Sequence, residues 1–567
     1  MYPVMGSIAP EQEKITKESG RVTMDRNARQ TVSAAAVLAC AWPALLLATV
    51  CLLPFLNKPF LIDDPWYLTM AQQIVKHPAH PMDFEICWNN ALLSGDCRKA
   101  SQFASGNPLL GQVGQGYVLV ATILGGAHEW MAHLTQLVMA WIAILTMTSL
   151  VLRFGWGRWH AIAGALLLVA IPPFLPMAST AMPDVLATAL ALIAIERLAA
   201  WKAEEKWSQG AAAAMALGLA GFARSHLVLL LPLGAFFLLD SFNPREIFFQ
   251  MRRKPWLWTP VLAGTCLLAI IILTLREHNL GVNPPGSEGS NFGRNLFSYL
   301  LFMAFPLPLA ACWMTNRVSS GRWTTVVITA GVALVPWICR LPMGLAAALS
   351  FAVLGCVALF ALLLEALEKR DHTALFLMLW LFIPLPIVFY VHLPMKYLLP
   401  CIPALIFLCF RLMEGVPLRA ARIAALAMIV AGTGYSILIL RSDEEFAEFG
   451  RDSLYQLISP HVAAGETVWY GGQYWSYWYA PLAGAKLTFP GGPQPRPGDL
   501  MVVDVFAGGY QELAHFPHRT LVDTIHYKYR FGRTMGAGIG LYSTNAGYWL
   551  WGFGEGPYDR YELWRVD

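Results

Sequence analysis

The first long apolar stretch of the chain runs from Ser33 to Leu56 and reads SAAAVLACAWPALLLATVCLLPFL. About 20 consecutive apolar residues are enough for a helix to cross the hydrocarbon core of a bilayer. The chain has 567 residues, of which 56% are apolar and only 13% are charged, whereas soluble domains carry about 25% charged residues. Ser33–Leu56 is therefore predicted to be a membrane span, and the composition predicts that others follow it.

Apolar runs of similar length recur as far as position 440. They predict a polytopic α-helical membrane protein with about thirteen transmembrane helices. The expected spans are 33–56, 130–152, 159–177, 182–200, 208–223, 225–240, 256–275, 295–314, 323–339, 344–366, 373–391, 395–413 and 418–440. The first 30 residues are polar and mixed in charge, so no cleavable secretory signal is expected there.

The distribution of basic residues predicts the orientation of these spans. With thirteen spans, 21 basic residues fall on the side of the N-terminus, and nine fall on the opposite side of the membrane region. Because positively charged loops stay in the cytoplasm, we expect a cytoplasmic N-terminus. An odd number of spans then places the C-terminal region outside.

The neighbouring runs 208–223 and 225–240 need a separate argument because only one residue, Arg224, lies between them. A single long helix would hold Arg224 at the membrane centre, at a cost of about 2.5–3.5 kcal/mol. A hairpin with Arg224 and His226 at its outer tip avoids that cost. Each arm of about 16 residues spans only about 24 Å, so we expect the tip to lie below the membrane surface.

Three regions follow from these patterns. Residues 1–30 are a cytoplasmic tail, and residues 31–440 are a membrane domain with one large outer loop, 57–129. Residues 441–567 are predicted to be a small outer α/β domain that begins with an amphipathic helix, Glu444–Ile458. Six short β-type runs follow that helix: Thr467–Tyr470, Lys486–Phe489, Asp499–Val505, Thr520–Tyr527, Gly540–Ser543 and Tyr561–Val566.

An acidic pair, Asp63-Asp64, opens the large outer loop directly after the first span. Two adjacent acids at a lipid–water boundary are costly and therefore point to a function. Asp64 before Pro65 is also typical of an N-cap for a helix over Pro65–Lys76 lying along the membrane surface. Both interpretations of Asp64 stay open, and either leaves Asp63 free to deprotonate an acceptor hydroxyl or amine. Asp83 and Glu85 are further acids of this loop, either in the site or simply solvated.

Basic residues at the outer ends of spans complement these acids. Lys396 begins span 395–413, and Arg224 and His226 occupy the hairpin tip. Such cations either extend to lipid head groups or bind a lipid phosphate or pyrophosphate. Lys396 and Arg224 together favour phosphate binding. Asp184, at the start of span 182–200, is either a helix cap or a further acid of the site.

The cysteines agree with this topology. Eight of the ten lie in expected spans, whereas Cys87 and Cys97 share the first outer loop. If that loop faces an oxidising compartment, Cys87 and Cys97 favour a disulfide, with a metal pair as the alternative.

No sequence pattern indicates a phosphate-cradling glycine loop, a zinc site or a nucleic-acid surface.

The order and placement of these motifs resemble the GT-C superfamily of membrane glycosyltransferases, in its protein-mannosyltransferase-like and aminoarabinose-transferase-like branch. Asp63-Asp64-Pro65-Trp66-Tyr67 matches the Asp-Glu/Asp-x-x-Tyr that opens the family's first outer loop. Met182-Pro183-Asp184 and the Gly-rich segment 218–231 with Arg224 are similar to later family features. The family's Arg-Tyr-Leu-Leu-Pro-x-x-Pro corresponds to Lys396-Tyr397-Leu398-Leu399-Pro400-Cys401-Ile402-Pro403.

The resemblance implies an inverting transfer of a sugar from a polyprenyl-phosphate-linked donor to a lipid, glycan or protein acceptor on the outer face of a bacterial inner membrane. Asp63, with Asp64, would be the catalytic acid pair, and Lys396, Tyr397, Arg224 and His226 would bind the donor phosphate. Tyr67, Asp83, Glu85 and Asp184 would belong to the acceptor and loop site. No cofactor is expected, although a divalent metal is compatible with the family.

Two departures from the family pattern affect the phosphate site. The loop's usual Lys/His-Pro-Pro-Leu is reduced to Gly106-Asn107-Pro108-Leu109, and Lys396 replaces an arginine. Lysine keeps the charge and loses the two-pronged geometry of a guanidinium.

The alternative to an enzyme is a non-enzymatic transporter or flippase for lipid-linked glycans, or a glycolipid-binding scaffold.

Overall fold

The computed structural model describes residues 32–86, 98–100, 112–239, 244–266, 292–303, 323–339, 343–390, 392–414, 416–471, 473–489, 492–506, 513–554, 556 and 559–567, and these are the described residues below. They are mostly helical. Six helical segments are long and apolar enough to cross a membrane: Ala34–Phe55, Glu129–Arg153, Leu345–Glu368, His372–Phe389, Met395–Leu412 and Leu418–Ala463. Each falls on an expected span, and the full count of thirteen stays a prediction.

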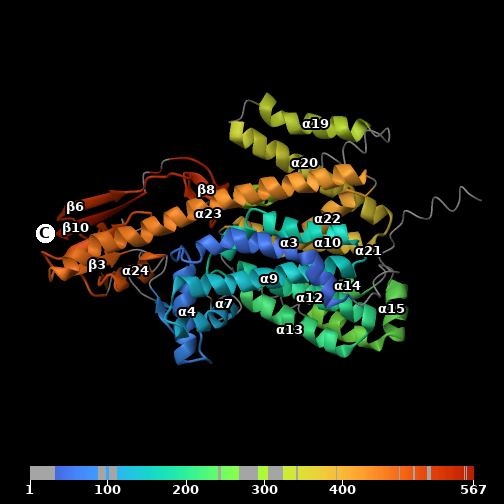
Figure 1. Ribbon diagram of the computed structural model, residues 1–567, viewed down its shortest axis with the longest axis horizontal. Helices are drawn as coiled ribbons and strands as arrows, with labels where there is room; N and C mark the ends of the chain where they lie inside the picture. Colours follow the sequence, from blue (N-terminus) through green and yellow to red (C-terminus); the bar gives the residue numbers. More distant parts are fainter. Residues whose placement is uncertain are drawn as a thin grey trace, which may run out of the picture.

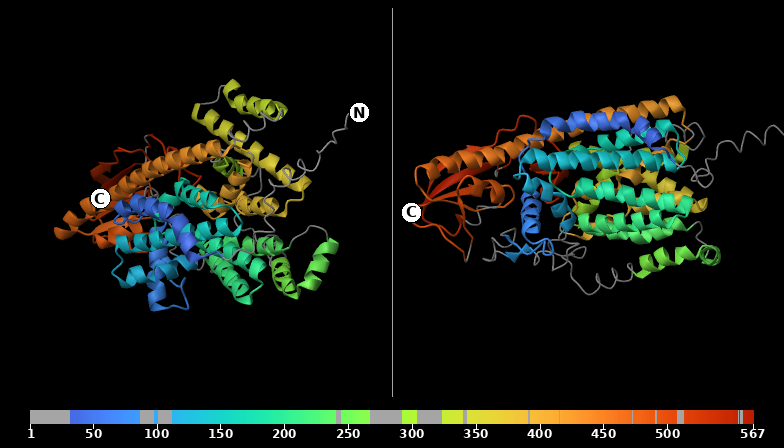
Figure 2. Two further views of the ribbon diagram at one scale, coloured as in Figure 1. Left: turned by 45° about the vertical axis from the view of Figure 1, so that its right-hand side comes forward. Right: turned by 60° about the horizontal axis from the view of Figure 1, so that its bottom comes forward.

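The bundle is built from helices that lie side by side along one direction (Figures 1 and 2). Its α-helices are α3 (Ala34–Leu52), α9 (Glu129–Arg153), α10 (Arg158–Ala170), α11 (Phe174–Ala178), α12 (Asp184–Glu204), α13 (Trp207–Ala223), α14 (Leu230–Leu238), α17 (Phe292–Phe302), α19 (Trp323–Ile338), α20 (Met343–Glu368), α21 (His372–Leu381) and α22 (Ile402–Leu412). Short 3₁₀ helices continue some of them: η1 (Leu53–Phe55), η2 (Ser225–Leu229), η3 (Pro255–Leu257), η4 (Leu385–Phe389) and η5 (Met395–Cys401). Helix α15 (Pro244–Arg253) lies at the edge of the bundle.

Helix α3 explains how the first apolar stretch packs. One face carries large side chains spaced by four residues, each more than half exposed: Leu38, Trp42, Leu46 and Val50. The other face is lined by small buried residues that let neighbouring helices approach closely: Cys40, Ala41, Ala44 and Ala48. An outward face of large apolar side chains is what a helix presents to lipid.

The hairpin expected at Arg224 is confirmed. Helix α13 ends at Ala223, and Arg224 is extended before η2 begins at Ser225. At one end of the hairpin Arg224 contacts Asp184 at the start of α12 (2.7 Å), and at the other Lys202 donates to the carbonyl of Phe237 in α14 (2.9 Å). The returning arm therefore runs antiparallel to α13, with Arg224 almost fully buried at 3% exposure.

The loop after the first span contributes a helix that crosses the end of the bundle nearest the C-terminal strands, and we call this end of the bundle, and this loop, outer. Helix α4 (Asp64–Lys76) lies nearly perpendicular to the bundle helices, between them and the C-terminal strands (Figure 2). Two short helices, α7 (Val113–Val118) and α8 (Val120–Leu124), pack beside it. The described part of the loop also holds an antiparallel pair, β1 (Glu85–Ile86) and β2 (Arg98–Lys99).

The last membrane helix differs from the expectation. We expected a span at 418–440 and a separate helix at Glu444–Ile458, but α23 (Leu418–Ala463) is one continuous helix of 46 residues. Figure 1 shows it in orange, running from the bundle to the C-terminal sheet. The helix changes from apolar to charged residues between Arg441 and Glu445, and Arg and Glu are good helix formers, so the helix continues through the change. A change in polarity was therefore mistaken for a break in the helix.

The C-terminal region contains a five-stranded sheet in the order β4-β3-β5-β10-β6. The strands are β3 (Val468–Gly471), β4 (Lys486–Leu487), β5 (Leu500–Asp504), β6 (Arg519–His526) and β10 (Arg560–Val566), and α24 (Ser476–Leu482) connects β3 to β4. Strand β3 pairs in parallel with β4 and β5, whereas β10 is antiparallel to β5 and β6. The outer part of α23 packs on this sheet, so an α/β arrangement is present among the described residues.

A second, smaller sheet has the order β7-β8-β9, with β7 (Met535–Gly536), β8 (Gly538–Gly540) and β9 (Gly547–Trp549). The strand expected at Gly540–Ser543 is therefore wrong except for its first residue. The chain turns there because Gly540 approaches the carbonyl of Gly547 so closely that a Cβ would lie 2.2 Å from the oxygen. A residue with a side chain would block this approach.

The C-terminal region is attached to the bundle by a buried ion pair. Lys58, just after the first span, contacts Asp443 of α23 at 2.5 Å, and both side chains have 0% exposure. Asp443 also accepts hydrogen bonds from Thr534 (3.0 Å) and Tyr542 (2.5 Å), while Lys58 donates to Ser179 (3.0 Å). We call Lys58, Asp443, Ser179, Thr534 and Tyr542 the sealed junction. It joins the first outer loop, the bundle and the C-terminal region.

Candidate functional site

Asp63 and Lys396, 333 positions apart, meet at the outer end of the bundle. The Nζ of Lys396 lies 3.2 Å from Oδ2 of Asp63. The lysine side chain is 2% exposed, whereas the aspartate side chain is 35% exposed. The predicted base and the predicted cation are therefore in contact, and only the carboxylate is open to solvent.

The backbone before Asp63 turns sharply. Ile62 has φ +47°, in the left-handed region, which a β-branched residue adopts at a cost of about 1–3 kcal/mol. Such strain concentrates at functional sites. Asp63 then takes the N-cap position of α4 without forming a side-chain cap, so its carboxylate is left for Lys396.

Asp64 has a different role from its neighbour. The expectation that it caps the helix is wrong, because Asp64 is already the first residue of α4. Its carboxylate accepts from the backbone N–H of Leu61 (2.9 Å) and of Ala181 (2.8 Å), and the residue is 0% exposed. Burial raises the pKa of Asp64 to about 7, although the two backbone donors and Lys58 oppose the rise. Asp64 thus ties the outer loop to the segment before α12.

Arg224 is held in a network beside this pair. Its guanidinium donates to Asp184 (2.7 Å) and to Gln112 (2.9 Å), and its central carbon lies 4.4 Å from the centre of the Tyr397 ring. The hydroxyl of Tyr67 donates to the same oxygen of Gln112 (2.6 Å). Burial raises the pKa of Tyr67 well above its usual range, so this hydroxyl stays protonated. The 2.7 Å contact with Arg224 makes Asp184, at the start of α12, the ion-pair partner of this arginine.

Lys396 and Tyr397 are presented by a 3₁₀ segment. Pro394 and Pro403 flank η5 and Pro400 lies inside it; proline cannot donate the hydrogen bond of an α-helix, so the segment forms the tighter 3₁₀ turn. Contacts besides Asp63 also orient the ammonium of Lys396, which lies 5.8 Å from the centre of the Tyr397 ring. It lies 3.3 Å from the sulfur of Met182 and 5.3 Å from the centre of the Tyr542 ring.

Several buried polar atoms of this cluster have no partner within the described residues: Oδ1 of Asp184, Nε of Arg224 and Nε2 of His226. Buried polar groups are nearly always hydrogen-bonded, so three orphans together indicate a place for a ligand or water. The ring of His226 lies 6.3 Å from that of Tyr397. His226 therefore joins Arg224 and Tyr397, as its place at the hairpin tip predicted.

His392 completes the cluster and was not singled out by the sequence. Its Nε2 lies 3.1 Å from the hydroxyl of Tyr397. Burial, with help from Lys396 and Arg224, lowers the pKa of His392 to about 4. At neutral pH this imidazole is uncharged and can share a hydrogen bond with Tyr397. We call Asp63, Lys396, Arg224, Asp184, Tyr397, Gln112, Tyr67, His226 and His392 the outer cluster.

Some expected site residues lie elsewhere. Asp83 and Glu85 follow the far end of α4, 13 residues long, and both are exposed. The structure therefore does not bring them to Asp63. Cys87 and Cys97 lie outside the described residues, as does the segment 106–109.

Three further residues of the neighbourhood were missed: Gln112, His392 and Tyr542. Gln112 has φ +55° and no motif around it. The position of His392 four residues before Lys396 was the only available signal for it. Tyr542 comes from the C-terminal region, which the sequence treats as a separate domain.

No group of three or more His, Cys, Asp or Glu side chains suited to hold a metal ion occurs among the described residues. The outer cluster offers one open carboxylate and four basic or imidazole side chains: Lys396, Arg224, His226 and His392. Comparison with known proteins yields no matching family model, no similar curated protein and no similar solved structure.

Proposed function

We propose that this chain is a membrane glycosyltransferase of the GT-C type, with thirteen spans, that transfers a sugar from a polyprenyl-phosphate-linked donor to an acceptor on the outer face of a bacterial inner membrane. The observation that carries the proposal is the contact of Lys396 with the half-open carboxylate of Asp63 (3.2 Å; 35% exposed). A general base needs access to its substrate, and a phosphate site needs cations; the two adjoin here.

In the proposed reaction the donor phosphate takes over the ammonium of Lys396 and so releases Asp63 from its ion pair. Asp63 then accepts the proton of the acceptor hydroxyl or amine. The acceptor attacks the anomeric carbon from the side opposite the phosphate. The carbon–oxygen bond to the phosphate breaks, its electron pair stays on the leaving polyprenyl phosphate, and Lys396 stabilises the charge that develops there. The configuration at the sugar is inverted.

Arg224 supports the same step from a fixed position. Its charge is balanced by Asp184, and it stacks on Tyr397 at 4.4 Å. Because Arg224 is already paired, it is expected to orient Tyr397 and His226 around the phosphate more than to supply net positive charge. The unpartnered Nε2 of His226 is then available to the donor.

The experiment compares purified wild type, Asp63→Asn and Asp452→Asn for donor binding and for transfer from a panel of polyprenyl-phosphate sugars to a mixed lipid and glycan acceptor pool. Asp452 is an exposed acid of α23 (64%) and serves as the matched control. We expect transfer by wild type and Asp452→Asn. Asp63→Asn should bind donor and turn over at least about 100-fold more slowly, as typical for a lost general base.

Full transfer activity in Asp63→Asn would overturn the assignment of the base. Donor movement across proteoliposomes without transfer would favour a transporter instead. Binding with neither transfer nor movement would favour a glycolipid-binding scaffold.

A further inference from the structure

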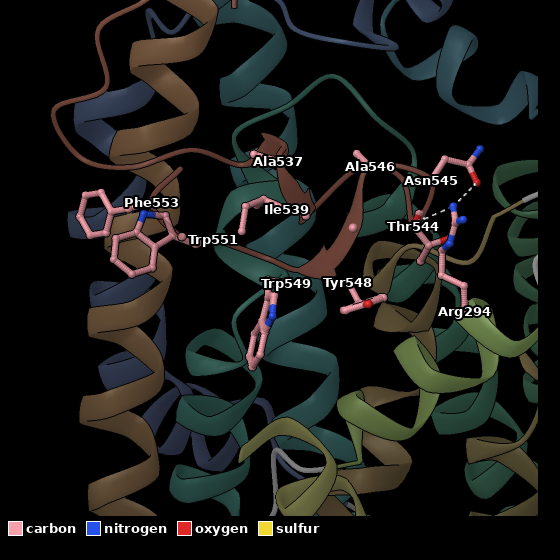
Figure 3. A pocket seen from close by; sticks show the side chains of 13 residues that line it. Arg294, Ala537, Ile539, Thr544, Asn545, Ala546, Tyr548, Trp549, Trp551 and Phe553 are labelled. Atoms are coloured by element: carbon pink, nitrogen blue, oxygen red, sulfur yellow. Dashed lines mark hydrogen bonds between the residues drawn. The ribbon is translucent and has the colours of Figure 1, made fainter. Parts of the chain in front are cut away.

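A hollow of about 670 Å³ lies on the C-terminal side of the bundle, and Thr544 of its lining accepts from the backbone N–H of Leu393 (3.1 Å), three residues before Lys396. Figure 3 shows it beneath the small sheet, with Arg294 of α17 at one end and Trp551 and Phe553 beside α23 at the other. Trp551 is fixed there by hydrogen bonds to Ser442 (2.9 Å) and to the carbonyl of Phe531 (2.8 Å). Ser442 belongs to the part of α23 that leaves the bundle, so the hollow lies at the level where lipid head groups begin.

The hollow offers hydrogen-bond donors and no acid. No aspartate or glutamate lines it. Arg294 is exposed and makes only two long contacts, to the carbonyl of Thr544 (3.3 Å) and to Asn545 (3.4 Å), with no acidic partner in the described part of the chain. Within that part, the indole N–H of Trp549 and the hydroxyl of Tyr548 also have no hydrogen-bond partner. Donors around an unpaired guanidinium favour an anion, and a phosphate ester in particular.

An apolar groove of about 350 Å³ adjoins the hollow, and Tyr548 and Trp549 line both. No charged side chain lines this groove. Its other walls come from the break between α10 and α11, from α17, from η5 and from α23: Pro172, Leu301, Phe302, Met395 and Tyr435. On α23, Val430 and Leu438 lie on either side of Tyr435 along the helix and are 64% and 40% exposed, as expected for lipid-facing positions. The groove therefore lies at the depth of hydrocarbon chains.

We propose that the hollow and the groove together bind an anionic glycerophospholipid of the outer leaflet. Its phosphate would contact Arg294, Trp549 and Tyr548, and one acyl chain would occupy the groove. A carbohydrate would also stack on the aromatic rings, but an uncharged sugar would leave Arg294 unpaired and the groove empty. The charge and the continuity of the two spaces therefore favour the lipid. This site adjoins the outer cluster, since Met395 precedes Lys396, but it shares no residue with that cluster and does not depend on the proposed transfer reaction.

The test uses the full-length protein, stripped of lipid in detergent and titrated with phosphatidylglycerol or phosphatidylcholine of identical chains. Binding is followed by native mass spectrometry. Arg294→Gln should weaken phosphatidylglycerol binding about tenfold, the size expected for one charge-assisted hydrogen bond, and Arg294→Lys should keep most of it. Arg441→Gln is the matched control, because Arg441 is an arginine of similar height whose partner is Glu444.

Equal binding of the two lipids, or no effect of Arg294→Gln, would overturn the proposal. Binding of oligosaccharides that competes with neither lipid and is lost in Arg294→Gln would assign the hollow to a glycan and would overturn it too. Asp63→Asn should bind phosphatidylglycerol like wild type. A loss of transfer and a loss of this lipid are therefore separable.

Discussion

Two lysines at the outer end of the bundle each pair with an aspartate, and the pairs differ in access. In the sealed junction, Lys58 and Asp443 are both fully buried. In the outer cluster, Lys396 is buried but Asp63 keeps 35% of its side-chain surface. A buried pair is costly to separate and is a poor place for exchange of partners. A half-open pair can release its acid to a substrate, so the comparison favours a role in stability for the first pair and supports the chemistry proposed for the second.

The same substitution at the two lysines tests this division, and the largest effect is expected at the sealed junction. Lys58→Met leaves the carboxylate of Asp443 buried without its counter-charge, which typically costs about 3–5 kcal/mol. We expect that loss in equilibrium unfolding in lipid–detergent micelles. Lys369→Met is the control, because Lys369 pairs with Glu365 on an exposed helix surface and should change stability by under about 1 kcal/mol. A stable Lys58→Met protein would show that the junction is not what attaches the two regions.

Lys396→Met should have a smaller effect, and on a different quantity. Asp63 remains partly hydrated, so the free energy of unfolding should fall by about 1 kcal/mol or less. Donor binding should weaken by about 1.5–3 kcal/mol, the usual worth of a hydrogen bond to a charged group. Titration with a polyprenyl-phosphate sugar measures the second effect. If Lys396→Met unfolds the protein as Lys58→Met does, the distinction between open and sealed pairs fails.

Tyr542→Phe probes the residue that touches both regions, since its hydroxyl binds Asp443 and its ring faces Lys396. The phenylalanine keeps the ring and loses the hydrogen bond, so a destabilisation of about 1–2 kcal/mol is expected. Turnover should change little, because the ring still orients the ammonium. Transfer rates measured well below the unfolding temperature separate the two. A large drop in turnover would mean that the sealed junction controls the site.

The last effect is a dependence on pH, and it concerns Asp64, the buried neighbour of Asp63. Its pKa is raised to about 7 by burial, above the ordinary value of 3.8. Between these values the folded protein holds a proton that the unfolded chain has released, so the stability due to Asp64 is full below pH 4 and declines as the pH rises to about 7. The difference in unfolding temperature between wild type and Asp64→Asn should shift against wild type over that range. A constant difference would contradict the raised pKa.

The sequence located much of the outer cluster because membrane topology restricts position. Asp63, Lys396 and Arg224 were all expected at the outer ends of spans, and a single lipid–water boundary brings such residues to one level. Tyr67 followed from its motif. Their pairing was not predictable, because Arg224 turned out to be balanced by Asp184, and nothing in the sequence distinguishes the acid that faces Arg224 from the one that faces Lys396.

Other features depend on contacts that leave no local pattern. Lys58 and Asp443 are 385 positions apart, and Asp64 is fixed by the backbone of Ala181, 117 positions away. Neither partner could be inferred from spacing. The domain boundary expected at residue 440 is a change from apolar to charged residues and not a break in the backbone, since α23 continues through it.

The length of α23 has a mechanical consequence. A helix of 46 residues is about 69 Å long, and its outer half is held to the five-stranded sheet while its inner half lies in the bilayer. The roughly 23 residues of α23 beyond Leu440 extend about 35 Å. If α23 moves as a rigid body, a change of about 10° in its tilt would displace its far end by about 6 Å. Bilayer thickness, which influences helix tilt, would thereby change the height and angle of the C-terminal region relative to the membrane.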